Sequence, residues 1–233
     1  MQCVGKYAKI DVIIREGKKE LMEKLEYIVV VFLVMSVYKL IFPLVKGVLG
    51  EFLVRCKLLV LPFDKYKVLN DIMLKTKRGT TQIDHIVVSI YGIFVIETKN
   101  YKGTIIGTGN RQEWVKSVHG ARYYFKNPLL QNRGHVLAIV NNLSIKEEFI
   151  IPIVVFSDEC RLNVKTNSIV IHLSKLISTI KNVKTKRFTK EQMNIIVRQL
   201  KALNQRGYIA KIKHLRYVKQ KEKKRKSKYM AKY

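Results

Sequence analysis

The chain has 233 residues, of which 48% are apolar, and a formal net charge of +28 at pH 7. The length fits one domain of ordinary size with extensions, or at most two small ones, and the apolar content is ample for a packed core. Three cysteines lie far apart with no CxxC pair, which argues against a disulfide framework and favours a reducing compartment. The five histidines are scattered as well, which argues against a structural zinc site.

The positive charge favours a polyanionic partner, either nucleic acid or an acidic membrane face. A coding bias offers an alternative explanation, because the sequence is rich in lysine, isoleucine and asparagine, as AT-rich coding would also produce. Charge alone therefore does not decide between these partners.

The N-terminal part contains one long apolar run. Residues 1–26 are polar and mixed in charge, and YIVVVFLVMSVYKLIFPLV follows at 27–45. This run just reaches the roughly 20 residues that a helix needs to cross a bilayer, and Lys39 near its far end can snorkel to the interface. We expect a single-pass membrane helix at 27–45. A buried core helix, an uncleaved signal-like segment and a shallow re-entrant helix remain alternatives, whereas the long polar lead argues against a cleaved signal peptide.

The flanking charges predict the orientation of such a helix. Residues 1–26 are nearly balanced in charge, and everything after the run is strongly basic. The positive-inside rule therefore places the C-terminal domain in the cytoplasm.

From residue 46 onward the pattern indicates an α/β domain that extends to about 205. Asn127 and Pro128 form a helix start, and Thr189 with Gln192 forms a capping box. The expected helices are 47–61, 127–144, 173–180 and 189–205. The expected strands are 66–75, 82–89, 92–99, 103–108, 112–117, 149–157 and 168–173.

Charged residues lie inside two apolar strands of this domain. Glu97 and Lys99 are two positions apart and point to one face of their strand, and Asp84 lies on the preceding strand across a short turn. Two carboxylates near a lysine suit a hard cation such as Mg²⁺ or Mn²⁺, with Asp84 and Glu97 as ligands. The alternative is a structural ion pair of Lys99 with Asp84 or Glu97, which contributes little when exposed.

Five sequence blocks follow one another in this domain. They are Gly50–Glu51, TQIDHIVVS at 81–89, GIFVIETKNYKG at 92–103, the lone Trp114, and NPLLQN at 127–132 with His135. In this order they resemble the NERD (nuclease-related) domain over residues 46–157. The resemblance implies an α/β fold of the restriction-endonuclease-like class, in which helices flank a mixed central sheet, here preceded by the N-terminal hydrophobic helix.

The same resemblance implies a catalytic centre made of Glu51, Asp84, Glu97, Lys99 and Gln131. It also implies a metal-dependent nuclease that acts on DNA, and it supports the expected membrane segment. On the residues alone, His135 is more simply a core or surface histidine than a phosphate contact, and Trp114 is more simply a core residue. Asn100 and Tyr101 follow Lys99 on a turn and are candidates for positioning substrate.

A basic tail follows the domain at 206–233. Its cations are interleaved with tyrosines, which suits contacts to phosphates and bases. We expect it to bind nucleic acid through Lys219, Lys221, Lys223, Lys224, Arg225 and Lys226. The competing interpretations of the whole chain are a nucleic-acid-binding module without turnover and a membrane-surface protein whose tail binds anionic lipid.

Overall fold

The computed structural model describes residues 2–77 and 79–205. The described residues divide into two compact units, one that ends at Val48 and one that begins at Leu49. The predicted basic tail, 206–233, lies outside the described residues, and so do all six of its expected nucleic-acid contacts.

Helix α1 runs over Gln2–Leu58 and so extends beyond both ends of the predicted membrane segment. The polar residues before 27 continue the same helix, because they are good helix formers with no strong breaker between them and the apolar run. Residues 21–42 are exposed throughout, including Phe32 and Leu40. By length and composition, the stretch Leu21–Leu58 of this helix could cross a bilayer, a test that a core helix or a signal sequence can also pass.

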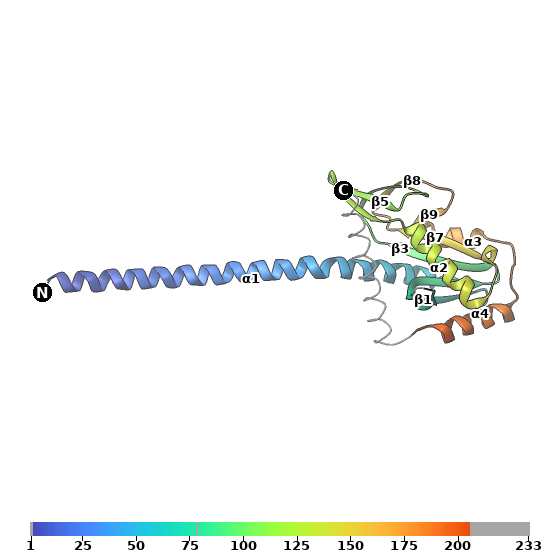
Figure 1. Cartoon of the computed structure of the whole chain (residues 1–233), viewed down its shortest axis with the longest axis horizontal. Helices are drawn as coiled ribbons and strands as arrows, with labels where there is room; N and C mark the ends of the chain where they lie inside the picture. Colours follow the sequence, from blue (N-terminus) through green and yellow to red (C-terminus); the bar gives the residue numbers. More distant parts are fainter. Residues whose placement is uncertain (1, 78, 206–233) are drawn as a thin grey trace. The chain divides into compact units, whose positions relative to one another are not determined.

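The second unit is built on a five-stranded mixed sheet (Figure 1). Its strand order is β1-β2-β3-β7-β9, with β1, β2 and β3 antiparallel and β3, β7 and β9 parallel. The strands are β1 (Tyr66–Thr76), β2 (Gly79–Ser89), β3 (Gly92–Lys99), β7 (Ile150–Phe156) and β9 (Ile169–His172).

Helices cover both faces of this sheet. On one face, α2 (Pro128–Leu143) and α4 (Lys190–Leu203) form an apolar cluster with the strands. On the other face, α3 (Leu176–Asn182) and the last turns of α1, through Val54 and Leu58, form a second cluster. The strand interiors are apolar on both faces, as expected for a sheet covered on both sides.

A second, four-stranded sheet carries the order β6-β5-β4-β8. Trp114 fills its core, stacked 6.2 Å from Phe156 of the large sheet. The strands are β4 (Gly103–Thr108), β5 (Glu113–Val118), β6 (Ala121–Lys126) and β8 (Cys160–Lys165).

The predicted α/β class with helices around mixed sheets and an apolar N-terminal helix is confirmed. The predicted helix starts are confirmed too: Asn127 caps α2, and Thr189 and Gln192 form the capping box of α4. Other details differ, since β2 begins at Gly79, before the expected strand at 82–89, and the expected helix at 173–180 is split into η2 (Leu173–Lys175) and α3. A further short 3₁₀ helix, η1 (Glu147–Phe149), precedes β7.

Candidate active site

Asp84 lies where β1 and β2 are irregular. Leu69 and Ile72 on β1 belong to the same apolar cluster although they are an odd number of positions apart, and the same is true of Ile83 and Ile86 on β2. The alternation of faces therefore shifts by one in both strands while their register is kept. Between the two β1 residues, Asp71 has a φ of 54°, a left-handed conformation that aspartate tolerates better than most residues.

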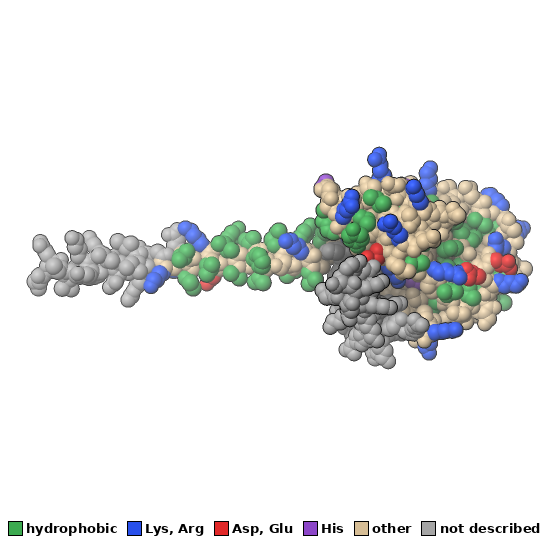
Figure 2. Space-filling view, turned by 45° about the horizontal axis from the view of Figure 1, so that its top comes forward, with side chains coloured by type: hydrophobic (Ala, Val, Ile, Leu, Met, Phe, Trp, Pro, Cys, Tyr) green, Lys and Arg blue, Asp and Glu red, His purple; other side chains and the backbone are tan. Residues whose placement is uncertain are grey.

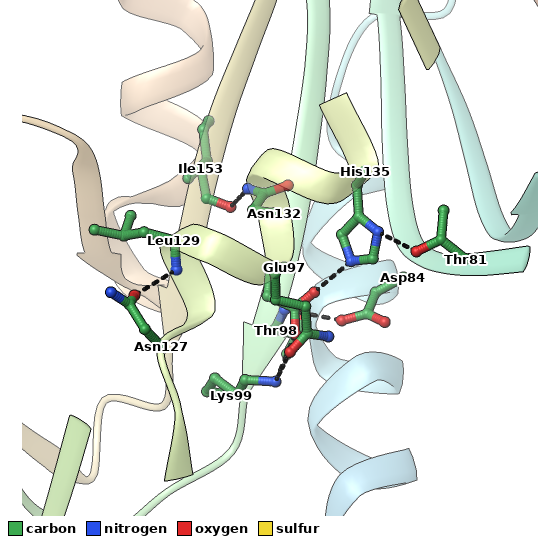
Figure 3. Close-up of polar contacts among 11 residues, drawn as sticks. Thr81, Asp84, Glu97, Thr98, Lys99, Asn127, Leu129, Asn132, His135 and Ile153 are labelled. Carbon is green, nitrogen blue, oxygen red and sulfur yellow. Dashed lines mark hydrogen bonds and ion pairs between the residues drawn. The ribbon is translucent and has the colours of Figure 1, made fainter. Parts of the chain in front are cut away.

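This irregular segment turns the carboxylate of Asp84 toward β3. Its Oδ2 accepts a hydrogen bond of 2.9 Å from the backbone N–H of Thr98, which lies between Glu97 and Lys99 (Figure 3). Asp84 is thereby fixed to the same strand end that carries the other two charged residues.

Glu97 is a charged residue in the interior, with its side chain 1% exposed. Both of its oxygens are occupied: Oε1 lies 2.5 Å from Nζ of Lys99, and Oε2 lies 3.0 Å from Nε2 of His135. Burial by itself would raise the pKa of this carboxyl, but Lys99 and His135 outweigh burial and hold it below the ordinary value. Glu97 is therefore ionised at neutral pH.

The ammonium of Lys99 connects β3 to α2. Besides Glu97, it donates to Oε1 of Gln131 at 3.3 Å. Burial would lower the pKa of Lys99, but the charge and hydrogen bond of Glu97 outweigh it and raise the pKa above 10.5. Lys99 is therefore a permanent cation at neutral pH.

The pKa of Asp84 is shifted in the opposite direction to that of Glu97. Burial, and then the negative charge of Glu97, raise the pKa of Asp84 well above its ordinary value, against the lowering effects of Thr98 N–H and Lys99. Glu51 also raises the pKa of Asp84, so its carboxylate lies within electrostatic range of the same site.

The last turns of α1 approach the site through a glycine. A Cβ added at Gly50 would lie 2.5 Å from Cβ of Asn100, the residue that follows Lys99. Only glycine allows this close approach without a shift, and the approach brings the neighbouring Glu51 to the strand end.

The structure thus brings together all five residues of the predicted centre: Glu51, Asp84, Glu97, Lys99 and Gln131. It adds His135, which lies one helical turn after Gln131, is 3% exposed, and bridges Glu97 to Oγ1 of Thr81 at 2.8 Å. The sequence indicates that Gln131 and His135 lie on one face of a helix, because they are four positions apart. It does not indicate that this face contacts Glu97 and Lys99 on β3.

Asn132 was missed as well, and it fixes the helix that carries Gln131. Its side-chain amide donates at 3.0 Å to the carbonyl of Ile153 on β7 (Figure 3). It also donates at 3.0 Å to the carbonyl of Val95 on β3. These two bonds hold α2 at a set position over the large sheet.

The donors at the site are hard oxygens. Asp84 and Glu97 could hold a small divalent cation together with water, because Mg²⁺ is commonly bound by one or two carboxylates and keeps several waters. Among the described residues, no group of three or more His, Cys, Asp or Glu side chains is arranged to hold a metal ion. Such a cation would keep most of its waters, and Asp84, whose pKa is raised by burial and then by the charge of Glu97, would gain most from it.

Comparison with known proteins agrees with this geometry. Residues 46–157 match the family model described as the nuclease-related domain, NERD. An uncharacterized protein of Bacillus anthracis is 43% identical over 105 residues, which are 45% of this chain and 50% of that protein. The chain thus spans about half the length of this curated relative, and no solved structure matches it.

The family match covers α1 from residue 46, the strand pair with Asp84 and Glu97, and the helix with Gln131. Residues 46–157 of this chain are thus a NERD, or nuclease-related, domain, and the mixed α/β fold around them is consistent with the restriction-endonuclease-like superfamily.

Proposed function

We propose that this protein is a nuclease that hydrolyses phosphodiester bonds in DNA and depends on Mg²⁺ or Mn²⁺. The observation that carries the proposal is the pair of carboxylates, Asp84 and Glu97, fixed at one strand end beside the ammonium of Lys99. A carboxyl whose pKa is raised by burial and a neighbouring carboxylate gains most from a cation at the site.

When bound, a divalent cation would polarise the phosphodiester and lower the pKa of a bound water. Asp84 and Glu97 are the side chains that would hold it. Glu51 adds negative charge to the same region and would hold it through water.

The chain's own groups have separate tasks. Because Lys99 stays protonated, it acts as a hydrogen-bond donor that stabilises negative charge on the phosphate or orients the attacking water, not as a base. Gln131 accepts from its ammonium and so limits its positions, and His135 holds the second oxygen of Glu97. Glu51, Asp84, Glu97, Lys99 and Gln131 thus form the proposed catalytic set.

The test is incubation of the full-length protein with plasmid and linear DNA, with Mg²⁺, with Mn²⁺ and with chelator. We expect cleavage with the metals and none with chelator, and we expect Asp84→Asn to abolish it. Asp64→Asn is the matched control, because Asp64 is an exposed carboxylate outside the site. Binding of DNA without any cleavage under either metal would instead favour a binding module, in which Glu97 is the structural partner of Lys99 and His135.

We also propose that the protein is anchored in a membrane through residues 27–45, with the catalytic domain in the cytoplasm. Support comes from the exposure of the apolar side chains of α1, since a soluble protein rarely leaves so large an apolar surface in water.

The basic tail is proposed as a second DNA contact, through the lysines and arginine at 219–226. Deletion of 207–233 should weaken DNA binding and flatten its salt dependence by about 0.7–0.9 for each phosphate that the tail neutralises. An unchanged salt dependence would leave lipid binding or no binding as the role of the tail.

A further inference from the structure

We propose that a single-stranded stretch of the nucleic acid docks on the β5–β6 hairpin, along a row made of Tyr101, Lys116 and Tyr123. The identity of the ligand rests on the proposed function, but its binding does not require cleavage. The row is distinct from the basic tail and contains none of the proposed catalytic residues.

The side chain of Lys116 lies between two tyrosine rings, one from the segment between β3 and β4 and one from β6. The ammonium of Lys116 lies 5.1 Å from the ring centroid of Tyr101 and 5.0 Å from that of Tyr123. Lys116 and Tyr123 are register partners on β5 and β6, so their side chains project from the same face of the small sheet. A cation between two aromatic rings offers one group for a phosphate and two for bases.

The row begins at the catalytic strand. Tyr101 follows Lys99 by two residues, and its N–H donates to the carbonyl of Lys99 at 3.1 Å. A strand positioned at Lys99 can therefore continue over Tyr101 toward Lys116.

The platform beneath the row is rigid. The ring of Tyr101 packs edge-on against Phe125 at 4.9 Å, and the indole of Trp114 is buried against Phe125 and Phe156. The indole N–H donates to the carbonyl of Thr108 at 2.9 Å, and a Cβ at Gly107 would lie 2.4 Å from the indole ring. The half-buried ring of Tyr101 is thus held against the core of the small sheet, which limits the entropy lost on binding.

The far end of the row is open to solvent. Tyr123 is 54% exposed and Tyr124, on the opposite face of β6, is 68% exposed. Between residues 110 and 126 the cations outnumber the single acid, Glu113; they are Arg111, Lys116, Arg122 and Lys126. Lysine and arginine side chains also predominate over acids on the face of this unit seen in Figure 2. This charge fits a polyanion, and the flat exposed rings fit unpaired bases better than a closed duplex.

The experiment measures binding of a fluorescein-labelled thymidine oligonucleotide to the full-length protein in chelator, by anisotropy over a salt series. Tyr123→Ala should weaken binding by about 5- to 150-fold, the range for loss of one stacked base. Tyr123→Phe, which keeps the ring, should bind like the wild type. Lys116→Ala should flatten the salt dependence by about 0.7, the value for one phosphate contact on a single strand.

The matched control is Arg198→Ala with Lys201→Ala, which removes two exposed cations from α4, a helix that packs on the large sheet. If Tyr123→Ala and Lys116→Ala bind no worse than this control, the docking site is overturned. An equal loss on a duplex of the same length would overturn the single-strand assignment.

Because binding is measured without metal, the outcomes separate. A protein that binds through the hairpin but cleaves nothing contradicts the proposed nuclease and leaves the docking site standing. If the protein cleaves DNA but the hairpin variants bind like the wild type, the nuclease proposal stands and the docking site is contradicted.

Discussion

At the scale of single residues, Glu97 and Lys99 contact each other, yet their removal should have different effects. Glu97→Ala should abolish cleavage and weaken Mn²⁺ binding, because a carboxylate ligand is removed. Lys99→Ala should leave Mn²⁺ binding near normal and lower the cleavage rate by about 10²–10³, the usual effect of one charge-stabilising group. Single-turnover cleavage and calorimetric Mn²⁺ titration measure the two effects.

Lys102→Ala is the control for this comparison. Lys102 is an exposed cation three positions after Lys99, paired with Glu159 at 3.1 Å, and its removal should change neither quantity. Loss of Mn²⁺ binding in Lys99→Ala as severe as in Glu97→Ala would contradict the division of roles.

His85 gives a prediction for the pH dependence of stability. It is 2% exposed, with Nδ1 2.7 Å from Oδ1 of Asn70, and burial and then the charge of Arg55 lower its pKa from 6.5 to about 4. Between these two values the unfolded chain binds a proton that the folded chain does not, so the free energy of unfolding should fall as the pH drops from 6.5 to about 4.

His85→Gln should remove this part of the pH dependence, since glutamine does not titrate. Urea unfolding of the two proteins at a series of pH values makes the comparison. The same loss of stability in both proteins over this range would assign the effect to other groups.

The sequence predicted the residues of the site better than their contacts. Strand alternation is enough to place Glu97 and Lys99 on one face, because it is a local rule. The contact of His135 with Glu97 depends on how α2 lies across β3, and this is set by long-range bonds such as those of Asn132. The shift of alternation beside Asp84 was also hidden, since nothing in QIDHIVVS marks it.

At the scale of elements, the contact of α1 with the strand end depends on Gly50. Gly50→Ala should lower the free energy of unfolding by about 1–3 kcal/mol, the usual cost of an overpacked contact, because Asn100 Cβ leaves no room. It should also lower cleavage, because Glu51 and Lys99 flank the contact. Thermal unfolding and initial cleavage rates measure both.

Gly134→Ala is the matched control. Gly134 is an exposed helical glycine on α2 with nothing within 4 Å of an added Cβ. Alanine there should raise the free energy of unfolding by up to about 1 kcal/mol, through helix propensity. If Gly50→Ala raised the free energy of unfolding as this control does, α1 would be able to shift away from Asn100, and the contact would not depend on glycine.

Two strands of the small sheet, β6 and β8, were not predicted from the sequence. The turn between β5 and β6 has His119 and Gly120 at φ of 47° and 81°, and two positive φ values are the mark of a tight hairpin. That signal was present in VHGA and would have predicted β6. The parallel pairing of β4 with β8 could not be predicted in the same way, because it joins Thr104 to Arg161, far apart in the chain.

At the scale of the whole molecule, the two units can be tested apart. With residues 27–45 in a bilayer, the full-length protein should stay with membranes after carbonate extraction, whereas a variant lacking 1–45 should be released. Release of the full-length protein would mean that the apolar helix is covered by protein instead. In intact cells, added protease should leave the domain after residue 46 uncut if that domain is cytoplasmic.

Trp114 is the single tryptophan of the chain, and it is fully buried in the small sheet. Its tryptophan fluorescence therefore reports on the small sheet and on the contact of that sheet with Phe156 of β7, whereas far-ultraviolet circular dichroism is dominated by the helices elsewhere. If the emission shifts to the red at lower urea than the dichroism changes, the small sheet opens as its own cooperative unit. Denaturant would then dismantle the platform of the hairpin row before the catalytic sheet, so binding to the row would be lost at a lower urea concentration than the catalytic centre.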